Sequence, residues 1–159
     1  MPAVDMIRSF IDYDIAMTSR VWDSIGTITG AQFVADDSYS RGSIRNLMVH
    51  LTHTELRWLT GLKNLPDEPD KLVPYASYAD RAAVRLYSDA VVAQLAAYVG
   101  SLTEAELNEP PADIPSPRWG VLLHLVNHGT DHRATVLQKL HELGAPTFDQ
   151  DYILWLAGK

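Results

Sequence analysis

Cysteine is absent from this sequence of 159 residues. Its absence excludes disulfide scaffolds, thiolate zinc sites, iron–sulfur clusters and cysteine nucleophiles. His, Asp and Glu are therefore the only strong metal ligands that the chain can offer, and six of its residues are histidines. The positions of these histidines are the main guide to function.

Basic residues are scarce relative to acidic ones. There are 13 Lys and Arg against 20 Asp and Glu, which gives a formal net charge of −7. Sequence-independent affinity for nucleic acids or for anionic membranes depends on clustered basic side chains. We therefore expect no nucleic-acid partner and no membrane partner.

Long hydrophobic runs are also missing. The longest apolar run, around residues 90–99, is interrupted by Gln94 and is too short to span a bilayer. The opening residues, MPAVDMIRSF, do not place a basic segment before an apolar core, as a secretory signal would. We expect a cytoplasmic protein, and the chain length predicts a single domain over residues 1–159.

Proline divides the chain into stretches with helical periodicity. Two proline clusters, at 66–74 and 110–117, predict connections because proline breaks helix interiors. Elsewhere apolar residues recur at spacings of three and four, which predicts helices. In chain order these are residues 3–29, a helix with Ser40 or Ser43 as N-cap ending near 65, a helix opened by a Ser77–Asp80 capping box and ending near 99, a single turn at 103–106, a helix with Ser116 as N-cap ending at 141, and a short tail helix at 150–157.

The sequence therefore predicts an all-α protein, a four-helix bundle with a short C-terminal helix. No alternating strand pattern and no internal repeat is visible. Two of the connections are long, so not every pair of consecutive helices needs to be antiparallel, and this favours a crossover topology.

A helical wheel separates the histidines. On the last long helix, His128 and His132 lie one turn apart, roughly 110° and 70° from the centre of the apolar stripe, whereas His124 is turned toward solvent at roughly 150°. On the second long helix, His50 lies about 120° from the stripe centre and can reach a seam between helices, while His53 lies nearly opposite the stripe.

His50, His128 and His132 can converge at one helix seam. Three imidazoles are the ligand set of many catalytic zinc sites, which leave one position open for water or substrate. A lone HxxxH pair is more often a solvated surface feature, but the row of three with a fourth histidine on another helix favours a metal site. We predict a divalent metal, with Zn²⁺ or Ni²⁺ as the expected occupant. His53 and His141 are predicted to be ordinary surface residues.

Three charged residues fall within apolar stripes. Asp14 and Glu55 lie near the stripe centres of the first and second long helices, and Arg133 lies roughly 30° from that of the last. Unpaired charges are costly inside a bundle, so we expect them to pair with each other or with an imidazole N–H. In a functional role, Glu55 or Asp14 would fix a histidine tautomer or act as a general base near a metal-bound water. In a structural role, Glu55 and Arg133 would form a buried bridge.

Several segments resemble the DinB/YfiT-like superfamily. They are YDIAMTSRVW (13–22), SIRNLMVHLTHTELRWL (43–59), WGVLLHLVNHGTDHR (119–133), LGAP (143–146) and the DYILWL tail. The resemblance covers essentially the whole chain. It implies an up-down-down-up four-helix bundle, commonly a homodimer, with a divalent metal held by His50, His128 and His132. His124 matches a frequent extra histidine of the family and is left outside the predicted ligand set.

The resemblance also implies classes of activity. Relatives look like S-transferases or isomerases that use a low-molecular-weight thiol such as bacillithiol or mycothiol, and others are assigned as hydrolases. The implied function is that of a metal-dependent enzyme acting on a small-molecule substrate, and nothing in the sequence chooses between an activated thiol and an activated water. Two alternatives stay open: a non-catalytic metal- or ligand-binding stress-response module, and a plain bundle whose histidines bind only purification nickel.

Overall fold

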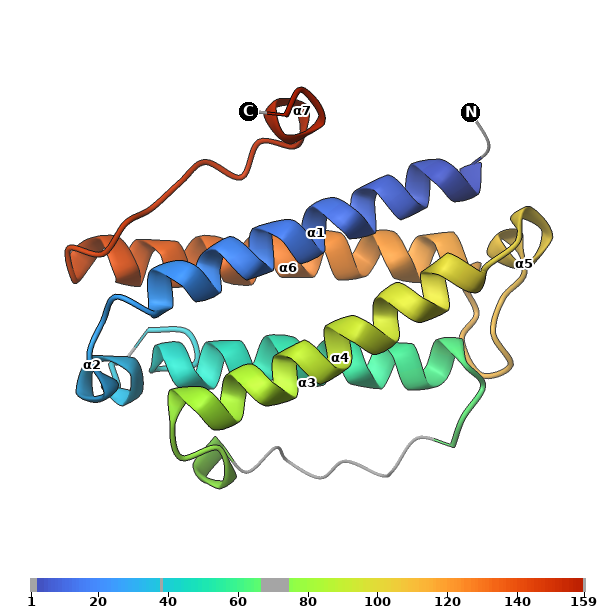
Figure 1. Ribbon diagram of the computed structural model, residues 1–159. Helices are drawn as coiled ribbons and strands as arrows, with labels where there is room; N and C mark the ends of the chain where they lie inside the picture. The colour runs from blue at the N-terminus through green and yellow to red at the C-terminus, as the bar shows by residue number, and fades with distance from the viewer. Residues whose placement is uncertain (1–2, 38, 67–74, 159) are drawn as a thin grey trace.

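Four long helices form the body of the protein (Figure 1). The computed structural model describes residues 3–37, 39–66 and 75–158. Within this part of the chain every regular element is a helix, which confirms the predicted all-α bundle. The long helices are α1 (Ala3–Ile25), α3 (Ile44–Leu62), α4 (Arg81–Ser101) and α6 (Arg118–Glu142).

The bundle has the up-down-down-up topology. Helix α1 packs against α6, α6 against α3, α3 against α4, and α4 against α1. Figure 1 shows that α1 and α6 run in one direction and that α3 and α4 run in the other. Because α3 and α4 are parallel, the chain crosses the length of the bundle between them, as the long connection predicted.

Local capping sets where the first two long helices begin and end. The first ends at Ile25, earlier than predicted, because Thr29 and Gln32 form a capping box that opens a separate short helix, α2 (Gly30–Val34). Of the two predicted N-caps for α3, Ser43 is the one used, and its side chain accepts a hydrogen bond from the backbone of Asn46. Helix α3 then ends at Leu62.

Two predicted N-caps are wrong. Asp80 alone caps α4, and Ser77 instead closes a short 3₁₀ helix, η1 (Tyr75–Ser77). The N-cap of α6 is Pro117, one residue after Ser116, and no side chain bonds to its first turn. A proline cannot donate a hydrogen bond, and its fixed φ suits the start of a helix.

The two shorter predicted helices are present. Helix α5 (Glu104–Asn108) is opened by a capping box between Thr103 and Glu106. The tail helix is α7 (Tyr152–Leu156), shorter than predicted. Tyr152 stacks on Phe10 of α1 with ring centroids 4.5 Å apart, so the tail covers the N-terminal half of α1.

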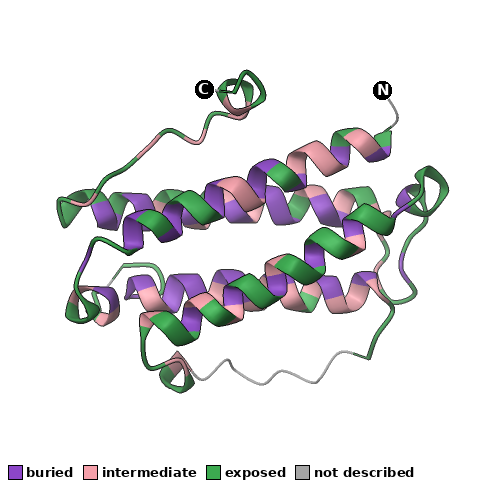
Figure 2. Cartoon of the chain, viewed as in Figure 1, coloured by how far each residue is buried: buried purple, intermediate pink, exposed green. Residues whose placement is uncertain are grey.

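The long helices have buried and exposed faces (Figure 2), and apolar residues dominate the buried ones. The buried residues form two clusters along the bundle axis, one containing Ile7, Ile11 and Leu125 and the other containing Trp22, Leu47 and Val136. Their burial supplies the main driving force for folding. Among the described residues, no helix has the length and the apolar content needed to cross a membrane.

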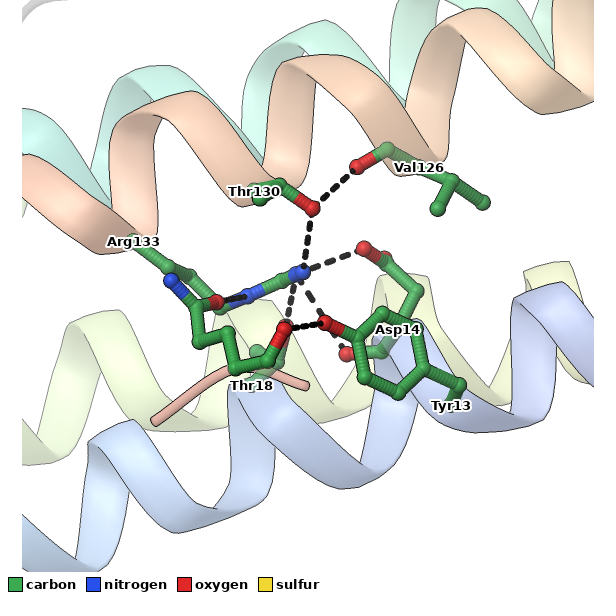
Figure 3. A network of polar contacts seen from close by, with 7 residues as sticks. Tyr13, Asp14, Thr18, Val126, Thr130 and Arg133 are labelled. Atoms are coloured by element: carbon green, nitrogen blue, oxygen red, sulfur yellow. Dashed lines mark hydrogen bonds and ion pairs between the residues drawn. The ribbon is translucent and has the colours of Figure 1, made fainter. Parts of the chain in front are cut away.

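A charged pair is buried between α1 and α6. Nη1 of Arg133 donates a hydrogen bond of 2.6 Å to Oδ1 of Asp14 (Figure 3), and the two residues are 0% and 2% exposed. Room for the pair comes from Gly129, one turn before Arg133. A Cβ at Gly129 would lie 2.6 Å from Oδ1 of Asp14 and 2.7 Å from Nη1 of Arg133. Glycine is therefore required there by close packing.

We predict that Gly129→Ala destabilises the protein by about 1–3 kcal/mol, because overpacking must displace the buried pair. Urea unfolding gives the free energy. The matched control is Gly100→Ala in α4, where a Cβ would meet no atom within 4 Å. The control should be neutral or stabilising by up to about 1 kcal/mol, since alanine is the better helix former. A Gly129→Ala protein as stable as the control would contradict this account.

Candidate metal centre

Helices α3 and α6 bring three histidines together. His50 comes from α3, and His128 and His132 come from successive turns of α6. Each offers a ring nitrogen, and the three nitrogens lie within 4.8 Å of one another. The ring centroids of His50 and His132 are 4.8 Å apart, and those of His128 and His132 are 4.3 Å apart. The three residues selected on the helical wheel therefore form one group that could hold a metal ion.

The state of these imidazoles suits metal binding. Burial lowers the pKa of His50 and of His128 to about 4, and burial also lowers the pKa of His132. All three rings are therefore neutral at pH 7, which is the form that ligates a metal. The Nδ1 atoms of His128 and His132 are buried, and no hydrogen-bond partner for them lies in the described part of the chain. Buried polar atoms are nearly always satisfied, so these two nitrogens mark a site that fits a metal ion.

The other three histidines stay outside the group. His124 is exposed and lies against Trp58, with ring centroids 5.2 Å apart. His141 is exposed at the end of α6, as predicted. The prediction for His53 is wrong, because its ring is half-buried and its Nδ1 lies 3.3 Å from the hydroxyl of Tyr87. A helical wheel places His53 only relative to the apolar stripe of α3. It does not show that α4 covers the opposite side of that helix.

The buried charges are arranged differently from the predicted bridge. Arg133 pairs with Asp14, not with Glu55. The same guanidinium donates to the hydroxyl of Thr18 at 3.1 Å (Figure 3). Through Nε it also donates to the side-chain oxygen of Gln150 at 2.7 Å. Arg133 thus joins α1, α6 and the segment that leads to α7. A guanidinium with several acceptors in a fixed geometry is the form in which a buried charge is best satisfied.

Glu55 is a buried carboxyl of a different kind. It is 3% exposed, and among the described residues no hydrogen bond or ion pair involves its carboxyl. Burial and the nearby charge of Asp14 raise the pKa of Glu55 to about 8. Burial also raises the pKa of Asp14, but Arg133 opposes that rise. Among these three residues, Asp14 therefore carries the negative charge that Arg133 matches, and Glu55 carries a proton at neutral pH.

Neither carboxyl orients a metal-site imidazole in this structure. In the part of the chain that is described, no hydrogen bond joins Asp14 or Glu55 to His50, His128 or His132. Asp14 and Arg133 pair with each other, and both act electrostatically on Glu55.

A comparison with protein families gives a match over nearly the entire chain. The model of the DinB family matches residues 5–157. The chain belongs to the DinB family. A separate comparison of the sequence with curated proteins finds no match. Family membership agrees with the bundle topology and with the position of the histidine group at the α3–α6 seam.

Sequence reasoning missed one charged residue at this DinB site. Arg41, in the segment between α2 and α3, places Nη2 at 3.4 Å from Nε2 of His50. The signal was the stretch Ser40–Arg41–Gly42, an arginine between a candidate N-cap and a glycine at the start of the helix that carries His50. Arg41 precedes the first residue of α3, so a helical wheel does not place its side chain.

We predict that Glu55→Gln changes how stability depends on pH. The folded-state pKa of Glu55 is raised from 4.5 to about 8, so the unfolded chain releases this proton first. The stabilisation from neutral Glu55 is full below pH 4.5 and is lost as the pH rises toward 8. Glutamine does not titrate, so its stability does not fall in this way. Between pH 5 and pH 8 the free energy of unfolding of the variant should therefore rise by on the order of 3 kcal/mol relative to that of wild type.

Urea unfolding at several pH values measures this difference. Subtracting wild type from the variant cancels the contribution of the histidines, whose lowered pKa values act in the opposite direction at acidic pH. The control Glu142→Gln removes an exposed carboxylate at the end of α6 and should leave the profile unchanged. A constant difference between Glu55→Gln and wild type across this range would show that Glu55 is ionised in the folded protein.

Proposed function

We propose that this DinB protein is a divalent-metal-dependent enzyme that acts on a small molecule. The observation that carries the proposal is a group of three histidines to which the described residues add no fourth protein ligand. Structural zinc sites are closed by four protein ligands, whereas catalytic sites keep one position open. We expect Zn²⁺ or Ni²⁺ at His50, His128 and His132, since imidazole accepts either ion.

The chemistry follows from an open position on a Lewis acid. A bound divalent ion lowers the pKa of a thiol or a water molecule and so supplies a nucleophile at neutral pH. The chain contains no cysteine, so a reacting thiol has to come from a small molecule. Thiol transfer or isomerisation and hydrolysis are the two reaction types that this site supports.

The protein's own residues hold this site in place. The neutral rings of His50, His128 and His132 offer lone pairs, and the Asp14–Arg133 pair fixes α6 against α1. We assign Asp14 and Arg133 to positioning and do not assign them to proton transfer. Glu55, protonated at neutral pH, keeps a second negative charge out of the core.

The homodimer and the cytoplasmic location stay predictions, because the structure of a single chain tests neither. Size-exclusion chromatography with light scattering measures the first, and fractionation of cells measures the second.

We predict that the protein binds one divalent ion per chain after chelator treatment and reloading with Zn²⁺ or Ni²⁺, and that His128→Ala and His132→Ala abolish stoichiometric binding. Mass spectrometry of the metal content measures this. The controls His124→Ala and His141→Ala remove histidines outside the group and should keep the ion. Unchanged metal content in His128→Ala or His132→Ala would rule out the proposed site.

A cobalt-substituted sample tests whether the site is open. Addition of a small thiol should change the Co²⁺ absorption spectrum if a coordination position is available. A spectrum that no added thiol changes would favour a closed, non-catalytic site.

A further inference from the structure

Arg41 faces the histidine group from outside the bundle. Its Nη2 lies 3.4 Å from Nε2 of His50, and the positive charge of Arg41 contributes to lowering the pKa of His50, His128 and His132. The guanidinium is therefore close to all three candidate ligands. No other Arg or Lys of the described chain acts on them in this way.

Among the described residues, no carboxylate pairs with the guanidinium of Arg41. Over the residues that the structure describes, Arg41 forms no ion pair, and the one hydrogen bond of its side chain is to His50. Asp131 acts on His128 and His132 from the exposed side of α6, but no ion pair joins it to Arg41. Among the described residues of this chain, whose net charge is −7, no carboxylate matches the positive charge that Arg41 places beside the imidazoles.

The backbone around Arg41 is built to hold it there. The residues on either side, Ser40 and Gly42, have positive φ values of 55° and 82°. The buried side chain of Asn46 donates a hydrogen bond of 2.9 Å to the carbonyl of Arg41. The φ of 82° at Gly42 is one that residues with a side chain rarely adopt, so glycine suits this turn. Backbone strain of this kind persists where the surroundings enforce it, and it is common at functional sites.

A cation beside a divalent metal site is unfavourable unless an anion lies near both. A guanidinium presents parallel N–H donors that match the two oxygens of a carboxylate. With a single arginine at the site, one positive charge matches a monoanion better than a dianion such as phosphate.

We propose that Arg41 selects substrates that carry a carboxylate next to the group that binds the metal. The substrate class is thus a small organic acid. This inference rests on the proposed function, since it requires a metal with an open position at His50, His128 and His132.

The test uses Co²⁺-loaded protein and two probes of equal length, 3-mercaptopropionate and 3-mercaptopropanol. Both carry a thiol that binds the metal, and only the first carries a carboxylate. Dissociation constants come from titration of the Co²⁺ absorption bands. We expect the preference for the acid over the alcohol to fall about tenfold in Arg41→Gln, the size expected for loss of a charge-assisted hydrogen bond. Chelation of the metal by the carboxylate itself would be the same in wild type and in Arg41→Gln. It therefore cancels when the ratio of the two dissociation constants is compared between the two proteins.

Two further variants sharpen the comparison. Arg85→Gln removes the same charge from α4, where the arginine pairs with Asp89, and should behave as wild type. Arg41→Lys keeps the charge without the planar fork and should retain only part of the preference. Circular dichroism checks that each variant is folded, which we expect because Arg41 is exposed.

The outcomes separate the two proposals. If wild type binds no Co²⁺, or if neither thiol changes its spectrum, the proposed function fails and this inference fails with it. If Co²⁺ and both thiols bind but Arg41→Gln keeps the wild-type preference, the inference is overturned and the proposed function stands.

Discussion

Helices α1 and α6 are joined near their middles by one buried charge pair, Asp14 with Arg133. Such a pair is not a large source of net stability, because desolvation of both ions offsets their attraction. Loss of one partner is costly, at about 3–5 kcal/mol, because an uncompensated charge is left in the core. The pair therefore acts mainly as a geometric constraint. It fixes the rotation of α6, and His132 is the residue directly before Arg133.

The remaining features follow from that constraint. Gly129 is small because the pair occupies the space beside it, and Gln150 is held by the same guanidinium, which ties the C-terminal segment to the bundle. Glu55 stays protonated because burial and the nearby charge of Asp14 raise its pKa, while Arg133, which pairs with Asp14, only partly opposes this. Burial lowers the pKa of the three histidines at the α3–α6 seam, so they remain uncharged and available as ligands.

Much of this structure could be predicted from the sequence. Helical periodicity gives the four long helices, and the i, i+4 spacing gives the pairing of His128 with His132. The wheel also identified Asp14, Glu55 and Arg133 as buried, but it could not choose the pairing, because that depends on how far α1 and α3 lie from α6. Asp80 and Pro117 replaced the predicted caps because several adjacent residues can cap a helix, and the packing decides which one does.

Tertiary contacts explain what the sequence did not reveal. His53 looked like a surface residue until α4 was placed over it, where it meets Tyr87. Arg41 lies outside any helix, so periodicity says nothing about where its side chain points. Its place beside His50 depends on two left-handed backbone conformations and on the side chain of Asn46, none of which a helical wheel represents.

The central claim is that the three-histidine group is a metal site with an open position. Crystals of protein loaded with Zn²⁺, measured on both sides of the zinc absorption edge, test it most directly. The account predicts one anomalous peak within bonding distance, about 2.0–2.1 Å, of a nitrogen of His50, His128 and His132, with no fourth protein ligand. A peak elsewhere, no peak, or a coordination sphere closed by a fourth side chain would contradict it.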